Sequence, residues 1–335
     1  MIRMKGKYKV IVFIIVLFIF LEIILTTTSY ALDIFLTEKQ ENIKVVDKNG
    51  EGDYTSIQEA LNKEPEGTTI FIKSGIYNEI LNINKKINLI GENKEDTIIH
   101  TVSEKNKYSI CLNAPEIAIE KLSIKNSGPG LYTSGIRITA SNIQIQDCHI
   151  YETPVGIAIF TSNNIINNSE FYGCTDEGVV LLGTSYLECK NNKIINCKFY
   201  ENCDGLELQH STDNIITNCE FYNNTHTGID AIISSNDRNI ISNCKIYNNN
   251  VHGLYLSSSS YNKIIDCSIL NNDNGNIVIN KDSKNNEIIS KSNIYTENKK
   301  EIYLKEIIYF LFSKKFDGPK IKIISLLKDK IITDF

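Results

Sequence analysis

NKIINCKFYENCDGLELQ at 192–209 and NIITNCEFYNNTHTGIDA at 214–231 are two copies of one pattern. In each copy an Ile lies three residues before a Cys, and a Phe lies two residues after it. A Gly followed by an apolar–any–apolar triplet then closes the copy. Apolar residues that alternate with other residues at a period of two are typical of β-strands. The chain is therefore built from repeats of short strands joined by turns.

The repeat extends through most of the chain. Eight copies begin at Ile119, Ile145, Ile166, Ile194, Ile216, Ile241, Ile264 and Ile289. One coil cannot bury its apolar residues alone, so stacked coils must share a continuous core. We predict an all-β fold, a single-stranded right-handed parallel β-helix over residues 45–300. This solenoid should have about eight to ten coils, each with three short strands. We expect the Gly of each copy to mark a turn with unusual backbone angles.

Cysteine fills one column of the repeat. Its members are Cys148, Cys197, Cys219, Cys244 and Cys267. Leu122, Ser169 and Ser292 occupy the same column in the other copies, which favours a packed core of small residues over thiol chemistry. Cys174 and Cys203 lie in the following turn on neighbouring coils, where they either form a disulfide or stay free. A second column, Tyr151, Tyr172, Tyr200, Tyr222 and Tyr247, predicts an aromatic ladder on the outside of one sheet.

Both ends of a solenoid expose its core and need a cover. YTSIQEAL at 54–61 predicts a short N-terminal capping helix, because Ser56 and Glu59 have the spacing of a capping box. We expect residues 301–335 to be a C-terminal capping or docking segment, since EIYLKEIIYFLFSKKF at 301–316 is strongly apolar. A membrane-surface or oligomer contact is the alternative for this segment.

The first 31 residues have the pattern of a targeting segment. Arg3, Lys5, Lys7 and Lys9 precede a long apolar run, and Ser29 and Ala31 have the small size that a signal peptidase requires. We predict a signal peptide over 1–31, or an uncleaved membrane anchor that would be the chain's one membrane contact. Removing four cationic residues and Glu22 changes the net charge from −5 to −5 − 3 = −8. Such an acidic chain is not expected to bind nucleic acid, and it is expected to be secreted or to lie at the cell surface.

The residues 45–101, VVDKNGEGDYTSIQEALNKEPEGTTIFIKSGIYNEILNINKKINLIGENKEDTIIHT, resemble the N-terminal region of pectin methylesterases and of surface proteins in the pectin-lyase-like superfamily. Residues 119–295 resemble NosD-like proteins and carbohydrate-active β-helix enzymes. The resemblance implies the β-helix fold and a polysaccharide or surface glycan as partner. The esterase set of catalytic residues is missing, because the corresponding coil GIAIFTSNN at 156–164 has no Asp and the chain has no Trp. The five His residues form no copper-binding cluster with Met.

One column of polar residues predicts a site. The middle residues of the Gly-containing strands should point outward, and they are Arg137, Ala158, Val180, Glu207, Asp230 and Tyr255. We therefore predict Glu207 and Asp230 as catalytic residues on adjacent coils, where two close carboxyl groups can divide acid and base roles. Asp204, His210, His226, His252 and Tyr255 are the predicted substrate-binding residues. We assign no metal ligand and no required cofactor, although calcium is a candidate because it takes carboxylate oxygens. A solvated acidic face without a site is the alternative.

These observations support three functions. The first is a secreted or cell-surface β-helix protein that associates with carbohydrate and has no complete catalytic set. The second is a polysaccharide lyase or glycoside hydrolase that uses Glu207 and Asp230. The third is a structural component of the cell envelope. Fold alone does not separate them, because one scaffold hosts many functions.

Overall fold

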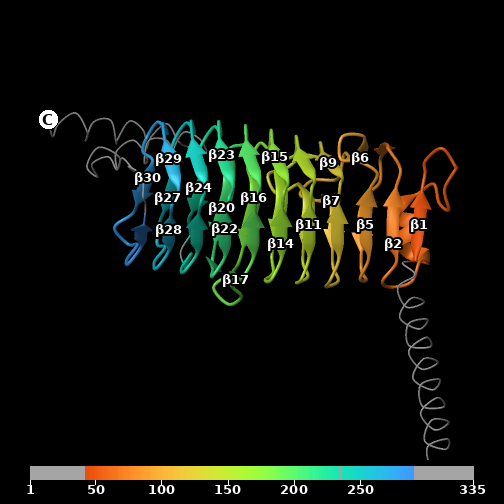
Figure 1. The fold of residues 1–335 in the computed structure, drawn as a ribbon, viewed down its shortest axis with the longest axis horizontal. Helices are drawn as coiled ribbons and strands as arrows, with labels where there is room; N and C mark the ends of the chain where they lie inside the picture. The colour runs from red at the N-terminus through yellow and green to blue at the C-terminus, as the bar shows by residue number, and fades with distance from the viewer. Residues whose placement is uncertain (1–41, 234, 290–335) are drawn as a thin grey trace, which may run out of the picture.

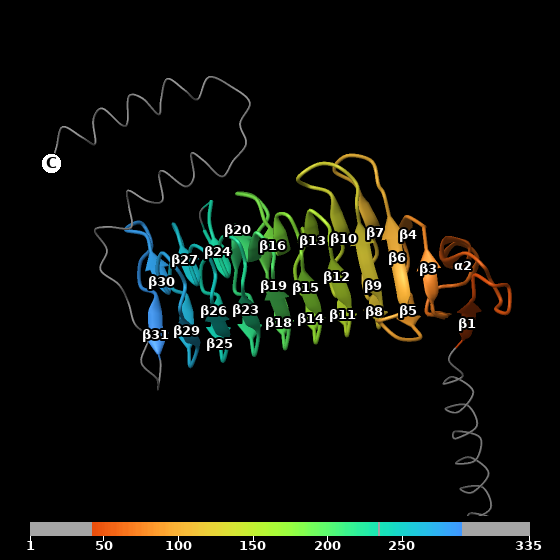
Figure 2. The same cartoon turned by 90° about the horizontal axis from the view of Figure 1, so that it is seen from above.

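The computed structural model describes residues 42–233 and 235–289, which wind into a right-handed parallel β-helix of about ten turns (Figure 1). The coils follow one another along a single axis from β1 to β31, and the turned view separates the faces of the rod (Figure 2). The strands of the described residues form three long parallel sheets and one short pair. The predicted β-helix is confirmed, with three strands in most coils.

The strand bounds define the sheets. Sheet A contains β1 (Ile43–Val46), β2 (Thr69–Ile72), β5 (Asn88–Gly91), β8 (Ala118–Glu120), β11 (Gln144–Gln146), β14 (Ile165–Asn167), β18 (Lys193–Ile195), β22 (Ile215–Thr217), β25 (Ile240–Ser242), β28 (Lys263–Ile265) and β31 (Glu287–Ile289). Sheet B contains β3 (Gly75–Tyr77), β6 (Thr97–Thr101), β9 (Ser123–Asn126), β12 (His149–Tyr151), β15 (Glu170–Tyr172), β19 (Lys198–Tyr200), β23 (Glu220–Tyr222), β26 (Lys245–Tyr247) and β29 (Ser268–Leu270). Sheet C contains β4 (Leu81–Ile83), β7 (Tyr108–Leu112), β10 (Ser134–Ile138), β13 (Val155–Ile159), β16 (Glu177–Leu182), β20 (Asp204–Gln209), β24 (Ile229–Ala231), β27 (Leu254–Leu256) and β30 (Ile277–Ile279). The short pair is β17 (Cys189–Lys190) with β21 (Ser211–Thr212).

The predicted isoleucine column is a ladder in sheet A. Ile145, Ile166, Ile194 and Ile216 are successive register partners and are buried. The last member was predicted wrongly, because Ile264 pairs with Ile288 and not with Ile289. The sequence offers two adjacent Ile residues at this point, and the pairing of Glu287 with Lys263 decides between them. Residues 290–300, which the predicted β-helix also included, lie outside the described residues.

Stacked aromatic and cysteine side chains fill the core beside this ladder. The rings of Phe171, Phe199 and Phe221 stack with centroids 4.8 and 4.6 Å apart. The five cysteines of the repeat column are buried and free, as predicted. Cys174 and Cys203 are also free thiols, although Cys203 N donates to Cys174 O at 3.0 Å. The tyrosine ladder of sheet B is present, but its rings are half-buried and stack on one another rather than standing exposed.

The repeat requires Gly for a different reason from the one that we predicted, which was unusual backbone angles. Gly156, Gly178 and Gly205 do not have positive φ. A Cβ at Gly156 would instead lie 2.1 Å from Gly178 O on the next coil, so only a hydrogen fits there. The left-handed turns are made by polar residues such as Asn168 (φ 48), Asn196 (φ 55) and Asn218 (φ 56). Asn tolerates this conformation better than most side chains, which explains the abundance of Asn at the turns.

Buried asparagines also link the turns from coil to coil. The side-chain N–H of Asn192 donates to Asn214 Oδ1 at 3.1 Å, and that of Asn214 donates to Asn239 Oδ1 at 3.0 Å. A parallel ladder connects Asn202, Asn224 and Asn249. Each side-chain amide donates a hydrogen bond to the Asn of the next coil, so these buried amide groups have hydrogen-bond partners.

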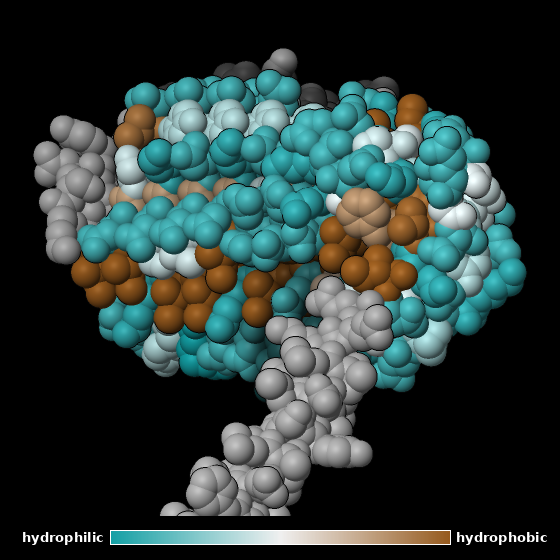
Figure 3. All heavy atoms as spheres, turned by 45° about the vertical axis from the view of Figure 1, so that its right-hand side comes forward, coloured by the Kyte–Doolittle hydropathy of each residue, from teal (hydrophilic) through white to brown (hydrophobic). Residues whose placement is uncertain are grey.

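The N-terminal capping helix is confirmed as α2 (Ile57–Lys63), where Ser56 Oγ accepts from Glu59 N at 3.2 Å. The predicted targeting segment 1–31 and docking segment 301–335 lie outside the described residues. Among the described residues, no helix is long and apolar enough to cross a membrane. Apolar patches interrupt a mostly hydrophilic surface (Figure 3), and exposed apolar side chains such as Val102, Leu131 and Tyr186 come from different coils.

Candidate functional site

Two columns of side chains form the outer face of sheet C. The middle column contains Arg137, Ala158, Val180, Glu207, Asp230 and Tyr255, which are successive register partners as the sequence predicted. The pre-glycine column contains the residues before each Gly, namely Ser134, Val155, Glu177, Asp204, Thr227 and His252. Val155, Ala158 and Val180 form an apolar cluster separate from the main core, which places both columns on the same outward side.

The predicted catalytic pair is adjacent but not solvated. Glu207 on β20 and Asp230 on β24 are register partners. Their side chains are largely covered, because Glu207 is 6% exposed and Asp230 is 4% exposed. The two side chains are therefore not part of a solvated face, and their catalytic role stays a prediction. Buried carboxyl groups need hydrogen bonds or partner charges, and Glu207 accepts a hydrogen bond from Gln209 Nε2.

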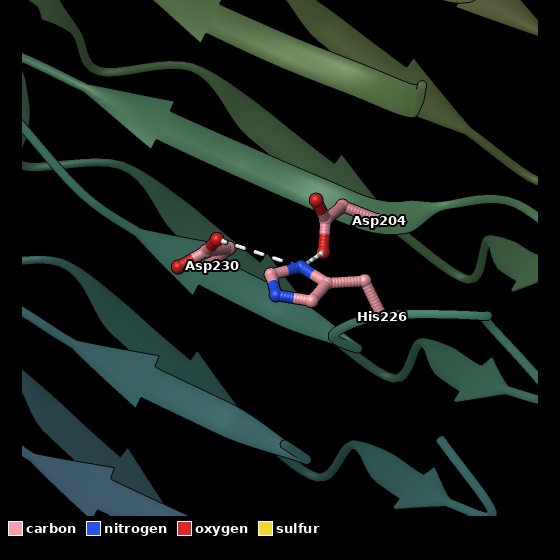
Figure 4. A group of neighbouring side chains, drawn as sticks. All are labelled: Asp204, His226 and Asp230. Atoms are coloured by element: carbon pink, nitrogen blue, oxygen red, sulfur yellow. Dashed lines mark hydrogen bonds and ion pairs between the residues drawn. The ribbon is translucent and has the colours of Figure 1, made fainter. Parts of the chain in front are cut away.

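His226 joins the two columns. Its Nδ1 lies 2.7 Å from Asp204 Oδ1 and 4.0 Å from Asp230 Oδ2 (Figure 4). Asp204 Oδ1 also accepts from Thr227 N at 2.8 Å, which fixes the carboxylate. Burial lowers the pKa of His226, but the hydrogen bond to Asp204 and the negative charges of Asp204 and Glu207 outweigh it and raise that pKa. The imidazole is therefore held in a defined orientation and favoured in its cationic form.

Glu177 is the covered carboxyl group one coil before Asp204. It pairs in register with Asp204 and is 8% exposed. Burial raises the pKa of Glu177 well above its usual range, and the negative charges of Glu207 and Asp176 raise it further. A carboxylic acid that keeps its proton beside an ionised carboxylate is the arrangement used for proton donation.

The remaining predicted residues separate into two groups. The ring of His252 is buried and stacks on Tyr255 at 5.3 Å between centroids. Both belong to the outer face of sheet C, one coil beyond Asp230. His210 follows β20 at the end opposite Asp204, in a left-handed turn at φ 45. It is not part of the group around His226.

Sequence reasoning missed Glu177, Thr227 and Gln209. Glu177 and Thr227 each precede a Gly of the repeat, and the same is true of Asp204 and His252. Aligning the copies on Gly rather than on Cys would have placed these four residues in one column. Their clustering with the middle column depends on the bend at Gly, which strand alternation alone does not predict.

Asp204, His226 and Asp230 could together hold a metal ion, because one ligand atom from each lies within 4.8 Å of the others. Two oxygens and one imidazole nitrogen form a mixed donor set. Calcium takes mainly oxygen ligands, so this trio suits calcium poorly without further carboxylates. The short contact between His226 and Asp204 is a hydrogen bond in its own right.

The family model described as "Pel9A-like, right handed beta helix region" matches residues 44–252. A probable pectinesterase/pectinesterase inhibitor 6 from Arabidopsis thaliana is 28% identical over 169 residues, which are 48% of this chain and 27% of that protein. The chain thus spans about a quarter of the length of this curated relative.

Solved structures give the same fold. The A-module of the mannuronan C-5 epimerase AlgE4 from Azotobacter vinelandii superimposes with a TM-score of 0.58 at 17% identity, over 70% of this chain and 71% of that one. A rhamnogalacturonan lyase superimposes with a TM-score of 0.56 at 15% identity, over 67% and 74% of the two chains. Pectate lyase Pel9A gives a TM-score of 0.51 at 13% identity, over 77% and 78%. Likenesses at such low identity concern the fold alone.

Proposed function

Because the chain belongs to the Pel9A-like right-handed β-helix family, a carbohydrate-active family, we propose that it cleaves an extended polysaccharide bound along the outer face of sheet C. The proposal rests on one observation, the stacking of covered carboxyl groups on the outer face of sheet C, where Glu177 pairs with Asp204 and Glu207 with Asp230. The names of the structural neighbours agree with a polysaccharide, since they act on pectate, rhamnogalacturonan and mannuronan. A flat β face along a rod suits an extended polymer.

Cleavage of a glycosidic bond requires a proton for the leaving oxygen and a base that accepts one. In this proposal Glu177 delivers the proton. The carboxylate of Glu207 or Asp230 accepts a proton from water in a hydrolysis, or from the sugar ring in an elimination. In the elimination, the His226 imidazolium, oriented by Asp204, stabilises the negative charge that develops on the sugar when the ring proton leaves. The proposed reaction uses no bound metal ion. A calcium ion would serve only as a bridge between carboxylates of the protein and an acidic glycan.

A second candidate is binding without cleavage. It is favoured by the low exposure of Glu177, Asp204, Glu207 and Asp230, because covered carboxyl groups are hard for a glycosidic bond to reach. In that case the stacked His252 and Tyr255 would contact a sugar ring. We also propose that the protein acts outside the cytoplasm, as the pattern of residues 1–31 indicates.

The test uses the full chain with polygalacturonate, rhamnogalacturonan and mannuronan. New reducing ends report cleavage, unsaturated products report elimination, and equilibrium binding reports association. Glu177→Gln should keep binding and lose turnover by about 100-fold or more, the usual worth of a general acid. The matched control is Glu220→Gln, a carboxylate on sheet B whose partner is Lys245 at 2.7 Å.

Equal turnover of Glu177→Gln and the unaltered protein would overturn the catalytic assignment. Binding without turnover in the unaltered protein would select the second candidate, and neither binding nor turnover would favour the structural envelope role. Parallel assays with calcium and with a chelator separate direct recognition from a calcium bridge. We expect turnover to survive the chelator.

A further inference from the structure

We infer that Arg137 and Ser134 form an anion-binding subsite on the outer face of sheet C, which takes a carboxylate of the bound glycan. The inference rests on the proposed function and adds a residue that sets its specificity. Arg137 lies on β10 and belongs to the middle column, three coils before Glu207. At the usual spacing of neighbouring strands, three coils correspond to about 14 Å.

Two aromatic rings fix the guanidinium. Its central carbon lies 5.2 Å from the centroid of the Tyr108 ring and 5.9 Å from that of Phe160. The Tyr108 hydroxyl donates to Asn82 Oδ1 at 2.9 Å, which holds the first ring in place. Arg137 Nη2 donates to Asn106 O at 3.1 Å. A guanidinium held between rings is preorganised for planar recognition of a carboxylate.

Two buried polar atoms on this coil lack a hydrogen-bond partner. Arg137 Nε and Ser134 Oγ are buried, and neither has a hydrogen-bond partner. Buried polar atoms without partners are rare and cost stability. The side chain of Arg137 stays partly exposed, so a ligand can reach the guanidinium.

The second arginine of the described residues provides the contrast. Arg238 makes a two-pronged ion pair with Asp213, at 2.8 Å from Nε and 2.9 Å from Nη2. Within the described ranges, no ion pair involves Arg137. Its charge is therefore available to an external anion.

An apolar strip separates the two charged regions. Val155, Ala158 and Val180 lie between Arg137 and the carboxyl group of Glu207, and Leu182 packs against them. A glycan could place one carboxylate at Arg137, rest its sugar rings on the strip and present a glycosidic bond to Glu177. A distance of about 14 Å exceeds the physiological Debye length of about 8 Å. The acidic cluster then repels an anion at Arg137 only weakly.

The experiment measures the binding of oligogalacturonates of defined length and of their methyl esters, which have the same rings without the charge. The unaltered protein should bind the acid form more tightly. Arg137→Gln should weaken binding of the acid form about tenfold or more, and it should change binding of the ester little. Arg137→Lys should recover part of the loss, because it keeps the charge but not the planar fork. Arg238→Gln is the matched control and should bind like the unaltered protein.

Several results would overturn the subsite. Melting temperatures of Arg137→Gln and Arg137→Lys first establish that both variants fold. Equal binding of the acid form and the ester by the unaltered protein contradicts the inference. So does an equal loss on both ligands in Arg137→Gln. Inorganic sulfate is a further probe, and competition by sulfate at concentrations as low as those of the oligomers would mean a general anion site instead. If Arg137→Gln binds normally while Glu177→Gln stops cleavage, the subsite is wrong and the proposed function stands. If no glycan binds, both fail.

Discussion

Glu177 on β16 and Asp204 on β20 are register partners on adjacent coils, although both carry carboxyl groups. Burial and neighbouring negative charges both disfavour the ionised form of a carboxyl group. Burial comes first among the causes that raise the pKa of Glu177, and the charge of Glu207 follows. The raised pKa of Glu177 agrees with the proton-donor role proposed for it.

This relationship predicts how stability depends on pH. A carboxyl group with a raised pKa binds its proton more tightly in the folded chain, so stability falls as pH rises above the unfolded value of about 4.3. The raised pKa of His226 acts in the same direction, because its stabilisation is present below about pH 6.5 and is lost as pH rises through the folded pKa. Glu177→Gln should flatten the fall in stability between pH 4.5 and 8, because the amide does not titrate. Melting curves across this range test it, and parallel curves for the two proteins would contradict it.

The contact between Asp204 and His226 predicts a second pKa effect. Asp204→Asn keeps the volume of the side chain but removes its charge. Burial then dominates, and the pKa of His226 should fall. An NMR titration of the His226 ring measures this directly. Asp213→Asn, which changes a carboxylate on another face, should leave the titration unchanged.

The asparagine ladder predicts a large stability effect. Asn214→Leu removes an amide that donates to Asn239 Oδ1 and Cys189 O and accepts from Asn192. The buried partners left behind should cost about 3 kcal/mol in the free energy of unfolding. Asn218→Gly is the control, because Asn218 has a φ of 56 that Gly adopts freely, and it should change stability by less than about 1 kcal/mol. Denaturant unfolding of the two variants compares them, and a similar cost for both would refute a special role of the ladder.

Thiol reactivity gives a fourth prediction. Burial raises the pKa of Cys148 and of Cys174 to about 12, so their thiols stay protonated and inert at neutral pH. Burial and the neighbouring carboxylates raise the pKa of Cys203 as well. It is nevertheless the partly exposed cysteine of the described residues, so access alone should make it react first with iodoacetamide in the native state. Mass spectrometry of the alkylated protein identifies the modified residue. Early labelling of Cys219 or Cys244 would mean that the core opens more readily than the ladder suggests. A disulfide between Cys174 and Cys203 would appear as a linked peptide that resists alkylation until it is reduced.

Part of the site was open to prediction from the repeat. The register of Glu207 with Asp230 follows from the alternation of strands, since equivalent residues of equal coils stack. Glu177 was missed because it lies before the Gly, where the strand bends and two residues three positions apart face the same side. The burial of the carboxyl groups was also missed, because an outward position in a strand does not reveal what covers it.

The sequence by itself determined the solenoid, its ladder of Ile, Cys and Phe, and the capping helix at Ser56. The ladders follow from the repeat, because equivalent residues of successive coils stack on one another. The helix follows from the local spacing of its capping residues. The tertiary structure decided what the repeat leaves open. It determined the proximity of Glu177 to Glu207, the hydrogen bond from His226 to Asp204, and the isolation of Arg137 from any carboxylate among the described residues. These relationships depend on the directions of side chains across three coils and on local burial. Burial shifts a pKa through desolvation, and the directions of the side chains decide which charges lie close enough to shift it.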